Sequence, residues 1–149
     1  MKISTRGRYT LRIVLDIALN QGEDGVVSMN DIAARQRISK KYGDQIAMQL
    51  CQSGILSATR GCQGGYRLSE SPSDVNVYQV VSVVEGTLAP VECLECDTKS
   101  CTCEGYCITL PVWQGLDRVT NEYLMGVTLS DILREAQNGS AECVSSDQN

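Results

Sequence analysis

The stretch that decides the fold runs from Ser28 to Leu68 and reads SMNDIAARQRISKKYGDQIAMQLCQSGILSATRGCQGGYRL. Ser28 is a helix-capping residue, and Asp31 follows it three positions later, which predicts a short helix after Ser28. A turn and a second capping residue, Ser39, then predict a longer helix that ends at Gly54. A short helix, a tight turn and a longer helix form a helix-turn-helix.

A glycine-rich segment with an arginine at its edge follows this helix-turn-helix. Residues 55–59 and 66–68 predict two short strands, with a hairpin tip between them. We therefore expect a winged helix, whose longer helix enters the major groove of DNA and whose hairpin reaches the adjacent minor groove. The alternative is a winged helix that binds only proteins, in which the same exposed side chains are merely solvated. The residues expected to contact DNA are Ser39, Lys40, Lys41, Tyr42, Gln45, Arg60 and Gly61.

The net charge of −5 over 149 residues is divided unevenly between the two halves of the chain. Residues 1–70 carry ten Lys or Arg and six Asp or Glu, whereas residues 71–149 carry three and twelve. A basic half beside an acidic half indicates that the first half meets an anion, and with the winged-helix pattern we expect that anion to be double-stranded DNA.

Further helices are predicted on both sides of this stretch. One runs from Ser4 to about Gln21, and another follows Pro72 and ends at Gly86. A long helix opens at Thr109 and Pro111, and a last one runs from a cap at Thr128 to about Ala136. The prediction is a mainly α fold with a small β-hairpin wing: a DNA-binding domain over 1–72, a cysteine loop and dimerisation helices over 73–137, and a disordered tail over 138–149.

The long helix carries an apolar stripe that little else in the chain can cover. We expect it to form a homodimer, since a two-fold dimer matches a pseudo-palindromic DNA site. The alternative is that the stripe packs back on its own winged helix. The residues expected at the interface are Val112, Trp113, Leu116, Val119 and Tyr123.

Five of the eight cysteines lie in the fifteen residues from Cys93 to Cys107, in a chain without histidine. Thiolates are soft ligands that select zinc, copper(I) or iron-sulfur clusters. The start of the chain does not read as a signal peptide, and no segment is apolar enough to span a membrane. We therefore expect a cytoplasmic protein, in which metal binding by these cysteines outranks structural disulfides.

Four separated motifs then carry a resemblance to a known family. They are MKISTRGRY at 1–9, SKKYGDQIAMQL at 39–50, RGCQGGYRL at 60–68, and a C-x7-C-x5-C loop that runs into CITLPVW at 107–113. In this order they resemble the IscR-like iron-sulfur regulators, within the winged-helix repressor family that also includes the nitric oxide sensor NsrR. The resemblance covers residues 1 to about 137 and implies a homodimeric transcription factor whose DNA preference changes with cluster occupancy. It favours a 2Fe-2S cluster over a 4Fe-4S cluster.

By this resemblance the three ligand cysteines are Cys93, Cys101 and Cys107, and the fourth ligand is open. The histidine common in the IscR branch is replaced by Leu110, and the amino-terminal carboxylate of the NsrR branch by Arg8. An external ligand is one alternative. The alternatives within the chain are the surplus thiols Cys96 and Cys103 and the carboxylates of Glu92, Glu95, Asp97 and Glu104.

The recognition helix also departs from the family, which commonly has leucine and glutamate where this chain has Gly43 and Asp44. In the IscR branch that glutamate governs discrimination between two classes of DNA site, so Asp44 keeps the charge with a shorter reach.

Two rival functions remain from the sequence. One is a winged-helix regulator in which four thiolates hold a structural zinc ion, and the other is an electron-transfer protein, disfavoured by the wing and the recognition helix. No nucleophile paired with a base and no phosphate-cradling loop is present, so an enzyme is not expected.

Overall fold

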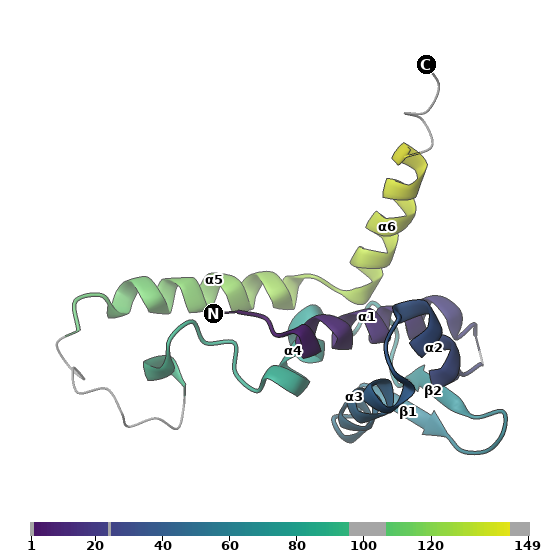
Figure 1. Cartoon of the computed structure of the whole chain (residues 1–149). Helices are drawn as coiled ribbons and strands as arrows, with labels where there is room; N and C mark the ends of the chain where they lie inside the picture. The colour runs from purple at the N-terminus through teal and green to yellow at the C-terminus, as the bar shows by residue number, and fades with distance from the viewer. Residues whose placement is uncertain (1, 24, 96–106, 144–149) are drawn as a thin grey trace.

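The computed structural model describes residues 2–23, 25–95 and 107–143. In that part of the chain the fold consists of helices and one antiparallel hairpin, which lies at its edge, as Figure 1 shows. The mainly α winged-helix prediction is confirmed. The elements are α1 (Thr5–Asn20), α2 (Met29–Gln36), α3 (Lys40–Gln52), β1 (Leu56–Thr59), β2 (Gly65–Leu68), α4 (Val77–Glu85), the short 3-10 helix η1 (Glu92–Leu94), α5 (Leu110–Gly126) and α6 (Leu129–Cys143).

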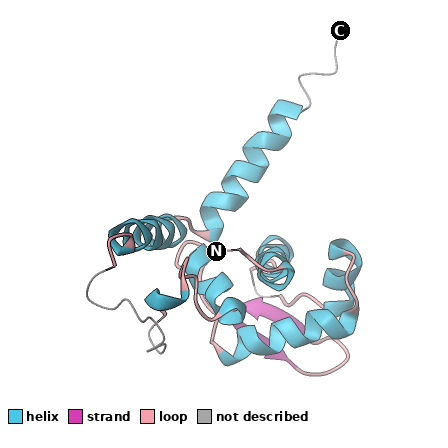
Figure 2. Cartoon of the chain, turned by 60° about the vertical axis from the view of Figure 1, so that its left-hand side comes forward, coloured by secondary structure: helices cyan, strands magenta, loops and turns pink. Residues whose placement is uncertain are grey.

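The first three helices begin at serine caps, as their sequences predict. The side chains of Ser4, Ser28 and Ser39 each accept a hydrogen bond from the backbone N–H three residues further on. The three helices then pack around one core, which the hairpin closes from the opposite side (Figure 2). Its fully buried side chains include Ile13, Ile17, Ile32, Ile46 and Leu50.

The hairpin is fixed to the helical core at both of its strands. Leu56 pairs with Leu68, and both side chains are buried. The backbone of Tyr66 also exchanges two hydrogen bonds with Val27, at 2.8 and 2.9 Å, just before α2 begins. The wing therefore keeps a defined position beside α2 and α3.

Gly43 in α3 has a packing reason. A Cβ atom built at this position would collide with the sulfur of Met29, at the start of α2. Glycine in a helix interior costs about 1 kcal/mol relative to alanine. Here the glycine is buried and leaves room for the side chain of Met29.

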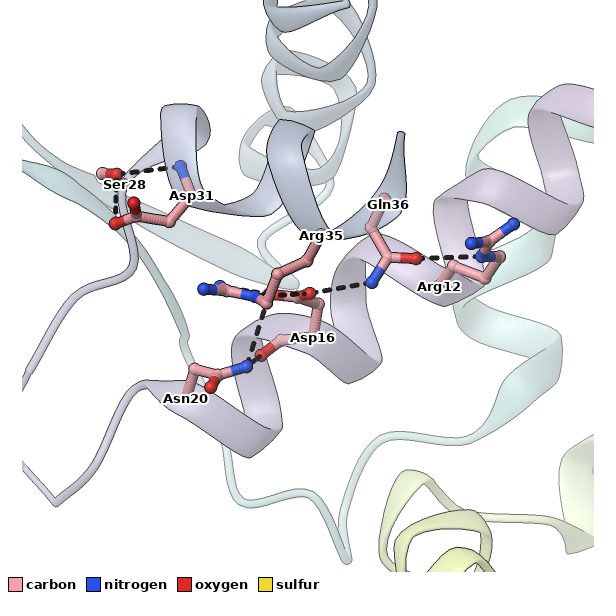
Figure 3. A network of polar contacts seen from close by, with 7 residues as sticks. All are labelled: Arg12, Asp16, Asn20, Ser28, Asp31, Arg35 and Gln36. Atoms are coloured by element: carbon pink, nitrogen blue, oxygen red, sulfur yellow. Dashed lines mark hydrogen bonds and ion pairs between the residues drawn. The ribbon is translucent and has the colours of Figure 1, made fainter. Parts of the chain in front are cut away.

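A network of polar contacts joins α1 to the end of α2 (Figure 3). The buried carboxylate of Asp16 accepts hydrogen bonds from Arg35, with Nη2 at 2.6 Å and Nε at 3.0 Å, and from Gln36 Nε2 at 2.8 Å. Gln36 accepts in turn from Arg12 Nε at 2.9 Å. The hydrogen bond to Asp16 raises the pKa of Arg35 above its ordinary value, so Arg35 stays protonated.

Replacing Asp16 with alanine is expected to lower the free energy of unfolding by about 2 to 3 kcal/mol. The change removes a carboxylate that is only 4% exposed, and it leaves the guanidinium of Arg35 and the side-chain N–H of Gln36 without this acceptor. This loss of stability is smaller than that expected for a fully buried ion pair, since the Arg35 side chain is 41% exposed. Urea denaturation followed by circular dichroism would measure it. The exposed carboxylate of Asp74 offers the control, and an Asp16→Ala midpoint no lower than that of Asp74→Ala would contradict the assignment.

The carboxyl-terminal helices α4, α5 and α6 form the second part of the fold. The helix α4 begins at a capping box made by Asn76 and Gln79, and Gly86 caps its end. The connection from α5 to α6 is tied back to α4, since Val77 N–H donates to the carbonyl of Val127 at 2.9 Å and Leu129 is fully buried. Figure 1 shows α5 running alongside α4 and α6 turning away from it.

The end predicted for the last helix was wrong. The sequence placed it near Ala136, with a tail from Asn138, whereas α6 continues to Cys143. The residues from Asn138 are rich in Gly, Ser and Asn, but the one glycine within α6, Gly139, costs a helix only about 1 kcal/mol, and no proline follows it. The remainder of the predicted tail, residues 144–149, lies outside the described residues.

Candidate DNA interface and cysteine site

The exposed side of α3 gathers most of the residues predicted to contact DNA. Burial of Gly43, Ile46, Ala47 and Leu50 fixes which side of the helix faces the core. The opposite side presents a shallow hollow of about 440 Å³, lined by Lys40, Lys41, Asp44, Gln45 and Met48. An exposed helix face with two cations and an amide is suited to the major groove.

A second hollow, of about 350 Å³, lies between α3 and the wing. It brings Lys40 at the start of α3 together with Arg60 and Gly61 at the wing tip, residues that the sequence separates by twenty positions. Gly61 has φ +110°, a backbone conformation that residues with a side chain rarely adopt. The turn at the wing tip therefore depends on glycine at this position. Both parts of the predicted interface therefore border one continuous surface.

The expectation of an exposed Tyr42 was wrong, because this side chain is half-buried. Its ring stands edge-on to Tyr9 of α1, with centroids 6.1 Å apart, and the guanidinium of Arg12 lies 4.9 Å from the Tyr9 centroid. Spacing along α3 alone does not reveal this contact with α1. Tyr42 therefore positions the start of α3 as well as bordering its exposed side.

Asp44 links the recognition helix to the wing. Its carboxylate accepts hydrogen bonds from Lys40 Nζ at 3.0 Å and from the hydroxyl of Tyr66 at 3.4 Å. Burial, and then the charge of Asp44, raise the pKa of Tyr66, so its hydroxyl stays protonated and able to donate. The Lys40 contact follows from the i, i+4 spacing, but sequence reasoning missed Tyr66, because β2 meets α3 only in the folded chain.

The structure describes two of the five clustered cysteines. Cys93 is exposed on η1, and Cys107 is half-buried just before α5, while Cys96, Cys101 and Cys103 lie outside the described residues. Among the residues that are described, no three potential metal ligands gather into one group. The predicted ligand set therefore stays a prediction.

Cys107 has surroundings that favour its thiolate. Thr109 Oγ1 lies 3.3 Å from its sulfur. Hydrogen bonds from the Thr109 hydroxyl, and then from the backbone N–H groups of Thr109 and Leu110, lower the pKa of the Cys107 thiol below its ordinary value. Hydrogen bonds to sulfur are also among the features that tune an iron-sulfur site.

The positions that hold the family's usual fourth ligands lie on two different helices, and two of the candidate carboxylates are described. Leu110 is the first residue of α5, and Arg8 lies on α1 beside an apolar hollow of about 290 Å³. Glu92 is exposed and Glu95 half-buried, whereas Asp97 and Glu104 lie outside the described residues. Two further cysteines are not part of the segment from Cys93 to Cys107. Cys51 packs half-buried against the core, where burial raises the pKa of its thiol, and Cys62 is exposed at the wing tip.

The predicted interface stripe on α5 lies at the surface of the single chain. Every one of its side chains is at least 36% exposed, so the alternative in which the stripe packs on its own winged helix is wrong. A different side of α5 faces the protein, where Thr120 and Leu124 meet α1 and α4 across the apolar hollow. The stripe consists of Val112, Trp113, Leu116, Val119 and Tyr123.

No helix in the described part of the chain is long and apolar enough to cross a membrane.

Comparisons with known proteins agree with this arrangement. Residues 3–135 match the family model Rrf2, described as an iron-dependent transcriptional regulator. The protein Rrf2 of Nitratidesulfovibrio vulgaris is 38% identical over 136 residues, which are 91% of this chain and 89% of that protein. The transcriptional regulator IscR of Photobacterium profundum is 34% identical over 137 residues, 91% of this chain and 77% of that one.

Two solved structures are also similar. IscR of T. potens superposes with a TM-score of 0.72 at 30% identity, over 100% of this chain and 94% of that chain. CymR, the global cysteine regulator of B. subtilis, gives a TM-score of 0.71 at 32% identity, over 89% of this chain and 95% of that chain.

Proposed function

Because this chain belongs to the Rrf2 family of transcriptional regulators, we propose that it binds operator DNA under the control of an iron-sulfur cluster held by its cysteine segment. Relatives of this fold include a regulator named for cysteine, so family membership does not identify the signal. The signal is inferred from this chain's own residues. The observation that carries it is Cys107, which lies three residues before the helix proposed to join two subunits and whose thiol has its pKa lowered by hydrogen bonds from Thr109 and Leu110.

The DNA-binding part of the proposal depends on charge and shape together. Lys40 and Arg60 line the hollow beside the wing, and Lys40 also lines the hollow on the exposed side of α3 together with Lys41 and Gln45. Lysine and arginine meet phosphates, and glutamine can pair with an adenine edge in the major groove. Ten of the thirteen lysine and arginine residues lie in positions 1–70, the part of the chain that forms the winged helix.

Arg60→Ala is expected to weaken operator binding by about 1 to 3 kcal/mol, because the wing tip loses its cation while the fold keeps its glycine turn. Gel shifts over a salt series would measure this, and wild-type affinity should fall steeply with salt as phosphate contacts release counterions. Arg134→Ala removes the same charge from α6 and serves as the control. Unchanged binding by both Arg60→Ala and Gln45→Ala would contradict the interface.

A homodimer is the second part of the proposal. The stripe on α5 is apolar, exposed and continuous along one side of the helix, whereas large apolar patches on a monomer's surface are uncommon. A two-fold dimer would place two recognition helices on a pseudo-palindromic site, where each half-site reinforces the other.

The cysteine segment fits a thiolate-ligated metal group. The chain has no histidine, and the donors around Cys107 stabilise negative charge on its sulfur. By family resemblance Cys93, Cys101 and Cys107 would hold a cluster, with 2Fe-2S favoured over 4Fe-4S; when bound, it supplies a centre sensitive to redox and nitrosative chemistry. The fourth ligand is proposed to be an oxygen or an external ligand, with Cys96 or Cys103 as the alternative.

Regulation would travel through α5. Cys107 lies shortly before this helix. A metal group bound to its sulfur would therefore restrict the position of the first turn of α5. The other side of α5 contacts α4 and α1, which belongs to the winged helix. Selection of duplexes from a random pool tests the function: the protein should enrich a pseudo-palindromic sequence, and its preference should differ between cluster-loaded and cluster-free protein.

A further inference from the structure

Met48 is an apolar side chain on the side of α3 proposed to read DNA. It is 56% exposed, whereas the apolar residues Ile46, Ala47 and Leu50 of the same helix are buried in the core. A single exposed methionine is ordinary on a protein surface. What distinguishes Met48 is its position among polar residues whose proposed role is contact with bases and phosphates.

Helix geometry places Met48 in line with those residues. It follows Asp44 by four positions and Gln45 by three, so its side chain is their neighbour on the helix surface. All three line the shallow hollow of about 440 Å³ with Lys40 and Lys41, whose side chains combine aliphatic stems with charged ends. Carbon therefore makes up much of the surface of this hollow.

We infer that Met48 is a specificity-determining residue that packs against the C5-methyl group of a thymine in the operator. The inference rests on the proposed DNA-binding function and adds an apolar contact to it. The thymine methyl is the only apolar group that a base pair presents in the major groove, and a flexible thioether adapts readily to it. With a rise of about 1.5 Å per residue, Met48 lies about 4.5 Å along α3 from Gln45, so the thymine should be one or two base pairs from the pair that Gln45 contacts.

Deoxyuridine in place of thymidine tests this contact, because it removes only the methyl group. The probes are duplexes that the wild-type protein selects from a random pool, resynthesised with deoxyuridine at one thymine per half-site at a time. Wild-type protein should bind one such substituted duplex about threefold to tenfold more weakly. Met48→Ala should bind the thymine and uracil forms of that duplex equally, and Met48→Leu should restore part of the difference.

Leu19→Ala is the matched control, since Leu19 is also apolar and 60% exposed but lies near the end of α1. This variant should keep the wild-type uracil penalty. Selective binding with no uracil penalty at any position, or a penalty unchanged in Met48→Ala, would overturn the inference and leave the DNA-binding function intact. Failure of the wild-type protein to select any duplex would overturn the proposed function, and this inference with it.

Discussion

Replacement of Cys107 by serine is expected to abolish the bound iron and the visible absorption of the anaerobically purified protein. Hydrogen bonds lower the pKa of the Cys107 thiol and so favour its role as a ligand, and oxygen is a poorer donor to iron in such sites. Cys93→Ser and Cys101→Ser should have the same effect. The measurement is iron and sulfide content per chain together with the absorption spectrum.

Cys62→Ser is the control for this series, because Cys62 is exposed at the wing tip and is not part of the cysteine segment. It should retain the full spectrum. Cys96→Ser and Cys103→Ser then decide the fourth ligand: retention of native iron by both indicates an oxygen or external ligand, whereas loss in one identifies a fourth thiolate. A Cys107→Ser protein with unchanged iron and spectrum would contradict the proposed site.

Leu116→Glu is expected to convert the dimer to monomers or aggregates and to reduce operator affinity by about two orders of magnitude. Leu116 lies within the exposed stripe of α5, and a charge buried between two copies would lack a partner. The affinity falls because a monomer loses the reinforcement of the second half-site. Analytical ultracentrifugation at micromolar concentration and gel shifts measure the two effects.

Gln114→Glu provides a matched control on the same helix. Gln114 is exposed but lies two positions from both Val112 and Leu116, so it sits on the opposite side of the helix from the stripe. The variant gains a similar negative charge and should remain dimeric. A monomeric wild-type protein, or a dimeric Leu116→Glu protein, would contradict the interface.

The sequence predicted the elements of the fold closely because their signals are local. Serine caps mark the starts of α1, α2 and α3, and Gly54 and Gly86 follow the ends of α3 and α4. Contacts between distant segments gave no such signal. The burial of Tyr42 against Tyr9, the approach of Met29 that requires Gly43, and the network around Asp16 all depend on helix packing.

The candidate site could be predicted in part for the same reason. Charge and helix spacing predict that Lys40, Lys41 and Gln45 share one side of α3, and the structure brings Arg60 of the wing next to them. The hydrogen bond from Tyr66 to Asp44 could not be predicted, since no spacing rule relates a residue in a strand to one in a helix. Cysteine density indicates metal binding, but ligand geometry depends on the path of the segment, which composition does not specify.

Metal and sulfide analysis of the wild-type protein tests the central claim most directly. The protein should be purified without oxygen, and its iron, acid-labile sulfide and zinc measured beside its absorption spectrum. The account predicts a coloured protein with iron and sulfide in equal amounts and little zinc, since iron-sulfur thiolate sites absorb visible light. A colourless protein that holds one zinc per chain and no sulfide would contradict it and establish the structural zinc site instead.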